Sequence, residues 1–137
     1  MLLTIIRIKL LIIKLKYFTK LNILINVSNL HVGGGVQVAT SFLNELKSIK
    51  SSNFFHVVVP DAVKNNIERN FSNKRFKFYF IKNSSSGFVS TLSQNLKLTR
   101  LESEIKPKVV FTLFGPSYWR PKSNHIMGFA DPWVLNP

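Results

Sequence analysis

Three consecutive glycines, Gly33, Gly34 and Gly35, are the first residues whose type and spacing suggest chemistry. Glycine has no side chain, so the backbone N–H groups of such a loop can approach a ligand closely. A helical apolar pattern follows directly, and a helix N-terminus favours a phosphate or an electron-rich sugar oxygen. The alternative is a tight turn that needs positive φ. One glycine would satisfy a turn, so three in a row favour a ligand site.

Two histidines, an aromatic pair and one acid are the other candidates for contacts with a substrate. His31 precedes the glycines and His125 precedes the last predicted strand, and either imidazole could bind a sugar hydroxyl, although solvated loop histidines are more common. Tyr118 and Trp119 follow the fourth predicted strand and could stack on a sugar ring or pack their loop against the domain. His125 and Asp131 are the candidate catalytic residues, although a turn residue is the slightly favoured interpretation of Asp131.

Metal, disulfide and dinucleotide sites are not expected. The chain has no Cys, and its histidines lack metal-ligand spacing; His56 lies within a predicted strand and is interpreted as structural. A dinucleotide fingerprint needs a third glycine where Val38 stands, and an acid at the end of the second strand, where Val59 and Pro60 occur. We therefore expect neither a metal nor a bound cofactor, and a dinucleotide oxidoreductase is disfavoured.

Alternating strand and helix patterns position these residues. The predicted strands are residues 21–27, 54–59, 76–81, 109–114 and 126–130. The predicted helices are residues 36–49, a short helix capped by Asp61, and residues 89–105. This order predicts an α/β fold with a Rossmann-like, doubly wound parallel sheet. Ligands of such sheets bind where the strand order reverses, so we expect loops 26–35 and 115–122 to converge there.

The net charge of +13, from 19 Lys and Arg against 6 Asp and Glu, favours anionic partners. Lys, Asn and Ile are frequent throughout, so a codon bias explains part of this excess equally well. Residues 1–19 are apolar with scattered cations and no acid, and they match neither a spanning helix nor a signal peptide. They are interpreted as an N-terminal extension, with attachment to an anionic membrane surface as the alternative.

Two stretches resemble a known family. The stretch NILINVSNLHVGGGVQVATSFLNEL is similar to the first strand, glycine loop and first helix of family 4 glycosyltransferases of the GT-B fold. The stretch VVFTLFGPSYWRPKSNHIMGFADPWVLNP resembles the later part of the same domain in bacterial members that build surface polysaccharides. The resemblance covers residues 20–137. It departs from the family at Ala130, where many members have a histidine.

The resemblance implies half of an enzyme. The family has two Rossmann-like domains and transfers a sugar from a nucleotide-sugar to an acceptor in the cleft between them, generally with retained configuration and without a metal. Residues 20–137 would be the N-terminal, acceptor-side domain, incomplete at its C-terminus, with the donor-binding domain absent and the chain alone inactive. Gly34 would face the donor phosphates. The acceptor would be a glycan or a lipid-linked glycan, and the location cytoplasmic or peripheral at the inner face of the cell membrane.

A basic binding module without catalysis is the alternative from another class. It would bind nucleic acid or a membrane and would need basic residues clustered on one face, with exposed aromatic rings for nucleic acid. Lys and Arg are instead dispersed along the sequence, and most Phe lie in predicted strands. Nucleic acid is therefore not the expected partner.

Overall fold

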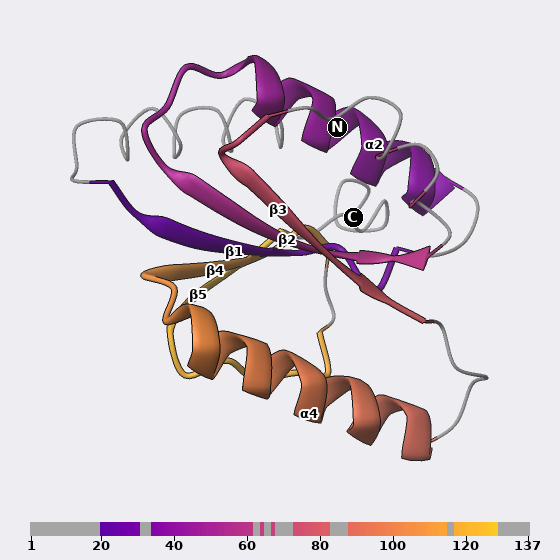
Figure 1. Cartoon of the computed structure of the whole chain (residues 1–137). Coiled ribbons are helices and arrows are strands. Elements are labelled where there is room, and N and C mark those ends of the chain that lie inside the picture. Colours follow the sequence, from indigo (N-terminus) through magenta and orange to yellow (C-terminus); the bar gives the residue numbers. More distant parts are fainter. Residues whose placement is uncertain are drawn as a thin grey trace, which may run out of the picture.

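The structure is a computed structural model that describes residues 20–30, 34–61, 64, 67, 73–82, 88–114 and 117–128. Its strands are β1 (Asn22–Asn26), β2 (Phe54–Pro60), β3 (Phe76–Ile81), β4 (Val109–Thr112) and β5 (Asn124–Met127), and its long helices are α2 (Gly34–Ser48) and α4 (Phe88–Ile105). The strands form one parallel sheet in the order β3-β2-β1-β4-β5, with α2 on one face and α4 on the other (Figure 1). The predicted Rossmann-like α/β fold is confirmed.

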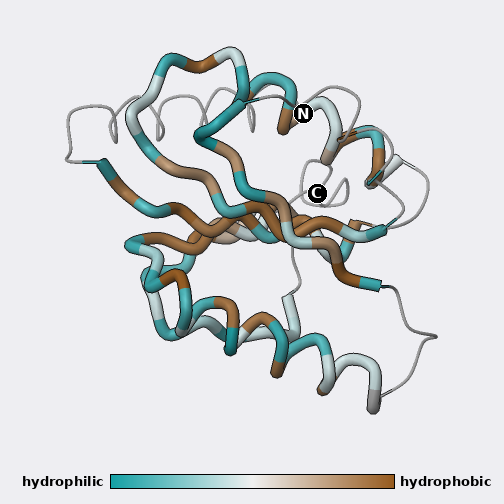
Figure 2. The backbone as a smooth tube through the Cα atoms, in the orientation of Figure 1, coloured by the Kyte–Doolittle hydropathy of each residue, from teal (hydrophilic) through white to brown (hydrophobic). Residues whose placement is uncertain are grey.

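Apolar side chains on both faces of the sheet explain why the strands are buried between helices. The isoleucines of β1, Ile23 and Ile25, are buried against α2 together with Leu43, whereas Leu24 is buried on the α4 side beside Val110. Hydrophobic residues consequently run along the centre of the sheet (Figure 2). Each fully buried aliphatic side chain contributes about 1.5–3 kcal/mol relative to its exposed state, so both faces hold helices.

The element boundaries differ from the predictions mainly where polar residues end a strand or helix. The observed α2 begins at Gly34 and ends at Ser48, against a predicted range of 36–49. The observed β5 begins at Asn124, before the predicted range of 126–130, because a strand that starts with Asn and His has no apolar pattern to reveal it. Of the predicted short helix, Asp61, Lys64 and Ile67 are helical, and Ile67 is buried in the core against α2.

A single arginine holds the connection between α2 and β2. The guanidinium of Arg75 donates to the carbonyl oxygens of Ile49 at 3.1 Å and Ser51 at 3.0 Å, and at 3.5 Å to that of Lys47 in the last turn of α2. These carbonyls would otherwise lack partners at the helix end. Arg75 therefore fixes the point at which the chain enters β2.

Lys106 ends α4 in a conformation that favours glycine. Its φ is 50°, and its N–H donates to the carbonyl oxygen of Glu102 at 2.8 Å, which is the bonding pattern of a left-handed helix cap. Pro107 follows and cannot continue the helix. A residue with a Cβ is strained in this conformation by about 1–2 kcal/mol.

Replacing Lys106 by glycine should therefore stabilise the fold. Part of the relieved strain is offset by the greater freedom of glycine in the unfolded chain, so we expect Lys106→Gly to raise the free energy of unfolding by about 0.5–1 kcal/mol. Urea denaturation measures this change, and Lys106→Ala, which keeps the Cβ, is the matched control. Lower stability of the glycine variant than of the alanine variant would contradict the assignment of the cap.

Candidate functional site

The sheet reverses its strand order at β1, and the loops that follow β1 and β4 meet there. The two strands are hydrogen-bonded neighbours, with Asn26 opposite Thr112. Beyond them the side chain of Asn29 donates to the carbonyl oxygen of Phe114 at 2.6 Å and links the two loops. Phe114 precedes the predicted loop 115–122, and Tyr118 and Trp119 of that loop contact α4, so the predicted convergence of loops 26–35 and 115–122 stays a prediction. We use the name crevice for the expected binding place at residues 28–30, Gly34, Gly35 and Phe114.

Buried polar side chains support the crevice from below. Asn26 is buried, and its side-chain oxygen Oδ1 accepts from the backbone N–H of Ser28 at 3.1 Å and from the Ser28 hydroxyl at 2.6 Å. This small ring of hydrogen bonds sets the direction in which the chain leaves β1. The sequence reasoning treated residue 26 as the start of a loop and missed its structural part; an asparagine that ends an apolar run was the available signal.

Gly34 presents bare backbone at the start of α2. A Cβ at Gly34 would have nothing within 4 Å, whereas one at Gly35 would lie 3.4 Å from the Leu30 side chain. Both glycines are helical, and neither has the positive φ of a turn glycine. The turn alternative therefore does not apply to these two positions. Gly33, His31 and Asp131 lie outside the described residues, so their predicted roles stay predictions.

Tyr118 and Trp119 point to different environments. The indole of Trp119 is only 3% exposed, packs in the core on the α4 side, and donates from Nε1 to the Thr99 hydroxyl at 3.1 Å. In this position the ring cannot stack on a substrate, and the packing alternative describes it. Tyr118 is 79% exposed, and its carbonyl oxygen accepts from the side chain of Asn95 on α4 at 3.2 Å. Its ring is free of the core and can contact a ligand or another chain.

His125 lies within β5 rather than at its carboxyl end, so the structure does not bring it into the crevice. Its Nε2 is 2.9 Å from the hydroxyl of Thr112, a fully buried residue at the end of β4. Burial lowers the pKa of His125, and the nearby Glu102 carboxylate opposes this shift more weakly. In this place a neutral imidazole links β5 to β4 through Thr112 and helps to fix the end of β4.

Glu102 of α4 is the buried acid beside His125. Its carboxylate accepts from the backbone N–H of Ser123 at 2.7 Å. Burial acts to raise the pKa of Glu102, but the hydrogen bonds from Ser123 and Lys122 together with the Lys122 charge outweigh it and lower that pKa. The acid thereby ties α4 to the loop that leads into β5. No prediction singled out Glu102, because nothing in its sequence neighbourhood distinguishes it from a solvated helix residue.

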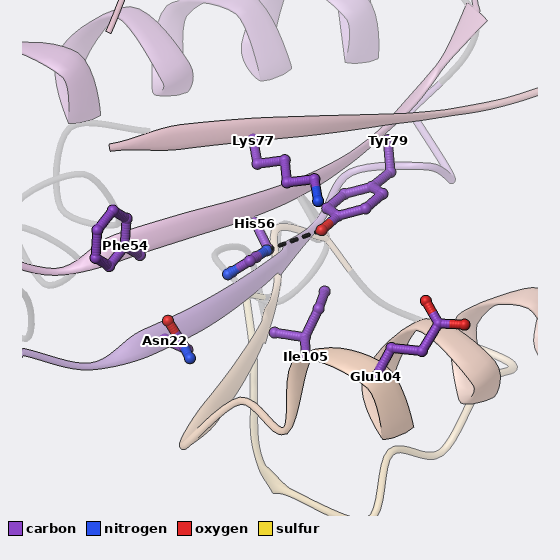
Figure 3. A pocket seen from close by; sticks show the side chains of 7 residues that line it. All are labelled: Asn22, Phe54, His56, Lys77, Tyr79, Glu104 and Ile105. Carbon is purple, nitrogen blue, oxygen red and sulfur yellow. Dashed lines mark hydrogen bonds between the residues drawn. The ribbon is translucent and has the colours of Figure 1, made fainter. Parts of the chain in front are cut away.

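A separate hollow of about 460 Å³ opens on the α4 face of the sheet, away from the crevice (Figure 3). In its wall, Nδ1 of His56 lies 3.0 Å from the hydroxyl of Tyr79, and the two rings stack with centroids 6.0 Å apart. Burial, and secondarily the charge of Lys77, lower the pKa of His56. The other lining residues are Asn22, Phe54, Glu104 and Ile105.

The hollow lies between the C-terminal end of α4 and the strands β1, β2 and β3. Within it the polar groups of His56 and Tyr79 are hydrogen-bonded to each other, which fits the structural role that the sequence suggested for His56. Among the described residues, no group of three His, Cys, Asp or Glu is arranged to hold a metal ion. In the same parts of the chain, no helix has the length and apolar character of a membrane span.

Gly128 is a position that the sequence reasoning missed. Its N–H donates to the carbonyl oxygen of Thr112 at 2.8 Å, and a Cβ would overlap the carbonyl oxygen of Leu113. That oxygen belongs to the backbone that directly follows β4, so it can move away from a Cβ only if the backbone next to Phe114 moves as well. Gly128→Ala should therefore lower the free energy of unfolding by about 1–3 kcal/mol, measured by urea denaturation.

Gly34→Ala is the matched control for Gly128→Ala, because its Cβ would meet no atom within 4 Å and the residue is helical. We expect this variant to be as stable as the parent, or more stable by up to about 1 kcal/mol. Equal losses of stability at the two positions would contradict the different environments assigned to them.

The two lowered histidine pKa values predict a pH-dependent stability. Between those values and the ordinary 6.5, the unfolded chain binds more protons than the folded chain, so stability is lost as the pH falls through this window. The melting temperature should decrease as the pH is lowered from about 7 to about 5. The double variant His56→Gln, His125→Gln should show a shallower decrease, and an unchanged slope would refute the assignment.

No protein-family profile, curated protein or solved structure matches the chain. The chain is a small α/β domain with a five-stranded parallel sheet whose strand order reverses at β1.

Proposed function

We propose that the chain is the acceptor-side domain of a GT-B glycosyltransferase that transfers a sugar from a nucleotide-sugar to a glycan or lipid-linked acceptor. The observation that carries the proposal is the bare backbone of Gly34 at the start of α2, beside the point where β1 and β4 diverge. The resemblance of residues 20–137 to family 4 glycosyltransferases supports it independently.

The crevice offers chemistry that suits a diphosphate leaving group. When a sugar leaves a nucleotide, negative charge develops on the phosphate oxygens, and the positive end of a helix stabilises such charge without a metal. The side chain nearest to Gly35 is the apolar Leu30, and residues 26–30 contain no acid that would repel a phosphate. The role of this domain would be to position the acceptor and to shield one side of the reacting bond from water.

The proposal places no catalytic base among the described crevice residues. Asn29 and Ser28 provide neutral polar groups, of which Asn29 is exposed and already bound to Phe114 through one amide hydrogen. Such groups can bind sugar hydroxyls but cannot take a proton at neutral pH. In the proposed enzyme the acid–base groups would come from the donor, from the second domain, or from residues such as His31 and Asp131.

Amide chemical shifts of the full 137-residue chain test the proposal directly. During titration with a panel of uridine, guanosine and thymidine diphosphate sugars and with acceptor oligosaccharides, we expect saturable shifts at Gly34, Gly35 and Asn29. Gly34→Val should abolish them, because the side chain would fill the open space over the helix start, while the melting temperature stays nearly unchanged.

Ser41→Val is the control for this experiment, since Ser41 is exposed on the same helix but lies two turns farther along. It should bind like the parent. If no donor and no acceptor shifts the Gly34 amide, or if Gly34→Val binds as well as Ser41→Val, the crevice is not the site and the proposal fails.

A further inference from the structure

Exposed lysines precede every strand of the sheet. We call this set the basic edge: Lys20 before β1, Lys50 before β2, Lys74 before β3, Lys106 and Lys108 before β4, and Lys122 before β5. All strands are parallel, so their amino ends lie along one edge of the sheet. Residues that are far apart in the sequence thus form one row of positive charge.

Contacts between the strand starts show that the starts of β1, β2 and β4 lie next to one another. The ammonium group of Lys20 lies 4.3 Å from the centroid of the Phe54 ring, at the start of β2. The N–H of Lys108 donates to the carbonyl oxygen of Asn22 at 2.9 Å, at the start of β1. With strands about 4.8 Å apart, five strands make a row roughly 20 Å long.

At the opposite edge, few of the described residues that directly follow a strand carry a charge. The residues directly after the five strands are Val27, Asp61, Lys82, Leu113 and Gly128, which include one acid and one cation. At the basic edge, two acids of α4 are already engaged: Glu102 accepts from Ser123, and Glu104 pairs with Arg100 at 3.1 Å. The basic edge thus carries six lysines, against one lysine and one acid in the residues that directly follow the strands.

Helix ends explain part of this charge but not all of it. The C-termini of α2 and α4 point to the basic edge, and the negative end of a helix favours nearby cations, which accounts for Lys50 and Lys106. Lys20 leads directly into β1 and follows no described helix, and Lys122 lies on the long connection from β4 to β5. The charge of Lys122 also acts on the buried Glu102 carboxylate, which offsets one of the six lysines, so a net positive charge remains at this edge.

We infer that the basic edge docks on an anionic lipid bilayer. A row of flexible lysines on one flat edge suits a surface of many phosphate groups, which attracts cations without needing fixed geometry. The edge lacks what nucleic acid requires among the described residues: the guanidinium of Arg75 is bound to backbone carbonyls, and Phe54 is covered by Lys20. Phe55 and Phe76 stack on one another at 5.0 Å.

The sequence that leads into this edge points the same way. Residues 1–19 directly precede Lys20 and combine apolar residues with cations and no acid, and attachment to an anionic membrane surface is the alternative interpretation of this segment. The inference goes beyond the proposed function and does not depend on it, because it concerns the edge opposite the crevice.

Vesicle flotation with the full chain tests the inference. The protein should float with phosphatidylcholine vesicles that contain phosphatidylglycerol, should not float with phosphatidylcholine alone, and should be released by high salt. The triple variant Lys20→Gln, Lys108→Gln, Lys122→Gln should bind roughly 100-fold more weakly. A second triple variant, Lys50→Gln, Lys74→Gln, Lys106→Gln, should show a comparable loss.

The charge-matched control is Lys64→Gln, Lys82→Gln, Lys97→Gln, which removes three exposed cations elsewhere and should bind within about threefold of the parent. Equal weakening by control and basic-edge variants would show that net charge alone acts, and full binding by both edge variants would assign attachment to residues 1–19. Either result overturns the inference. So would tighter binding to single-stranded nucleic acid than to vesicles, lost in the edge variants.

Discussion

The central strand β1 hydrogen-bonds to β2 on one side and to β4 on the other, and this double pairing determines where the remaining elements lie. The chain adds β2 and β3 on one side of β1 and then has to cross back over the sheet to add β4 on the other. A right-handed crossover places its helix on one face when the chain moves across the sheet in one direction and on the other face when it moves back. The helices α2 and α4 therefore cover opposite faces. The loops after β1 and β4 consequently leave the sheet in opposite directions, and the Leu113–Asn26 and Asn29–Phe114 hydrogen bonds link the chain where they diverge.

The sequence predicts the parts of this fold that depend on apolar periodicity. Residues 76–81 were predicted and observed as a strand with the same bounds, since FKFYFI is β-branched or aromatic at most positions and bounded by polar residues. Periodicity says nothing about polar groups that satisfy one another, so Asn26, Thr112 and Glu102 were missed although each is buried. It also cannot say which way a loop residue points. Tyr118 and Trp119 are adjacent and were assigned one role, yet one ring is exposed and the other is in the core.

The distribution of charge along the sequence also failed to predict where charges gather in the fold. Lys and Arg are dispersed along the sequence, which argued against a basic binding surface. A parallel sheet brings residues from separate places in the chain to one edge, because each strand begins at the same end. A lysine before every strand is therefore scattered in sequence and clustered in space. In an α/β protein, charged residues that cluster in space can be separated by a whole strand–helix unit in the sequence. A short window of sequence therefore does not reveal such a cluster.

If both proposals hold, the two edges of the sheet attract anions by different means. At the carboxyl edge the charge is that of the helix N-termini, carried by backbone N–H groups that are fixed in direction, so binding there depends on geometry and would be lost when a side chain covers Gly34. At the amino edge the charge resides on flexible lysine side chains, so binding there depends on their number and on salt. The strands separate the edges by about 15–20 Å, the length of five or six residues. A domain held to a bilayer by its amino edge would thus present its crevice away from the lipid, where it could meet the extended glycan of an acceptor more readily than the lipid headgroup.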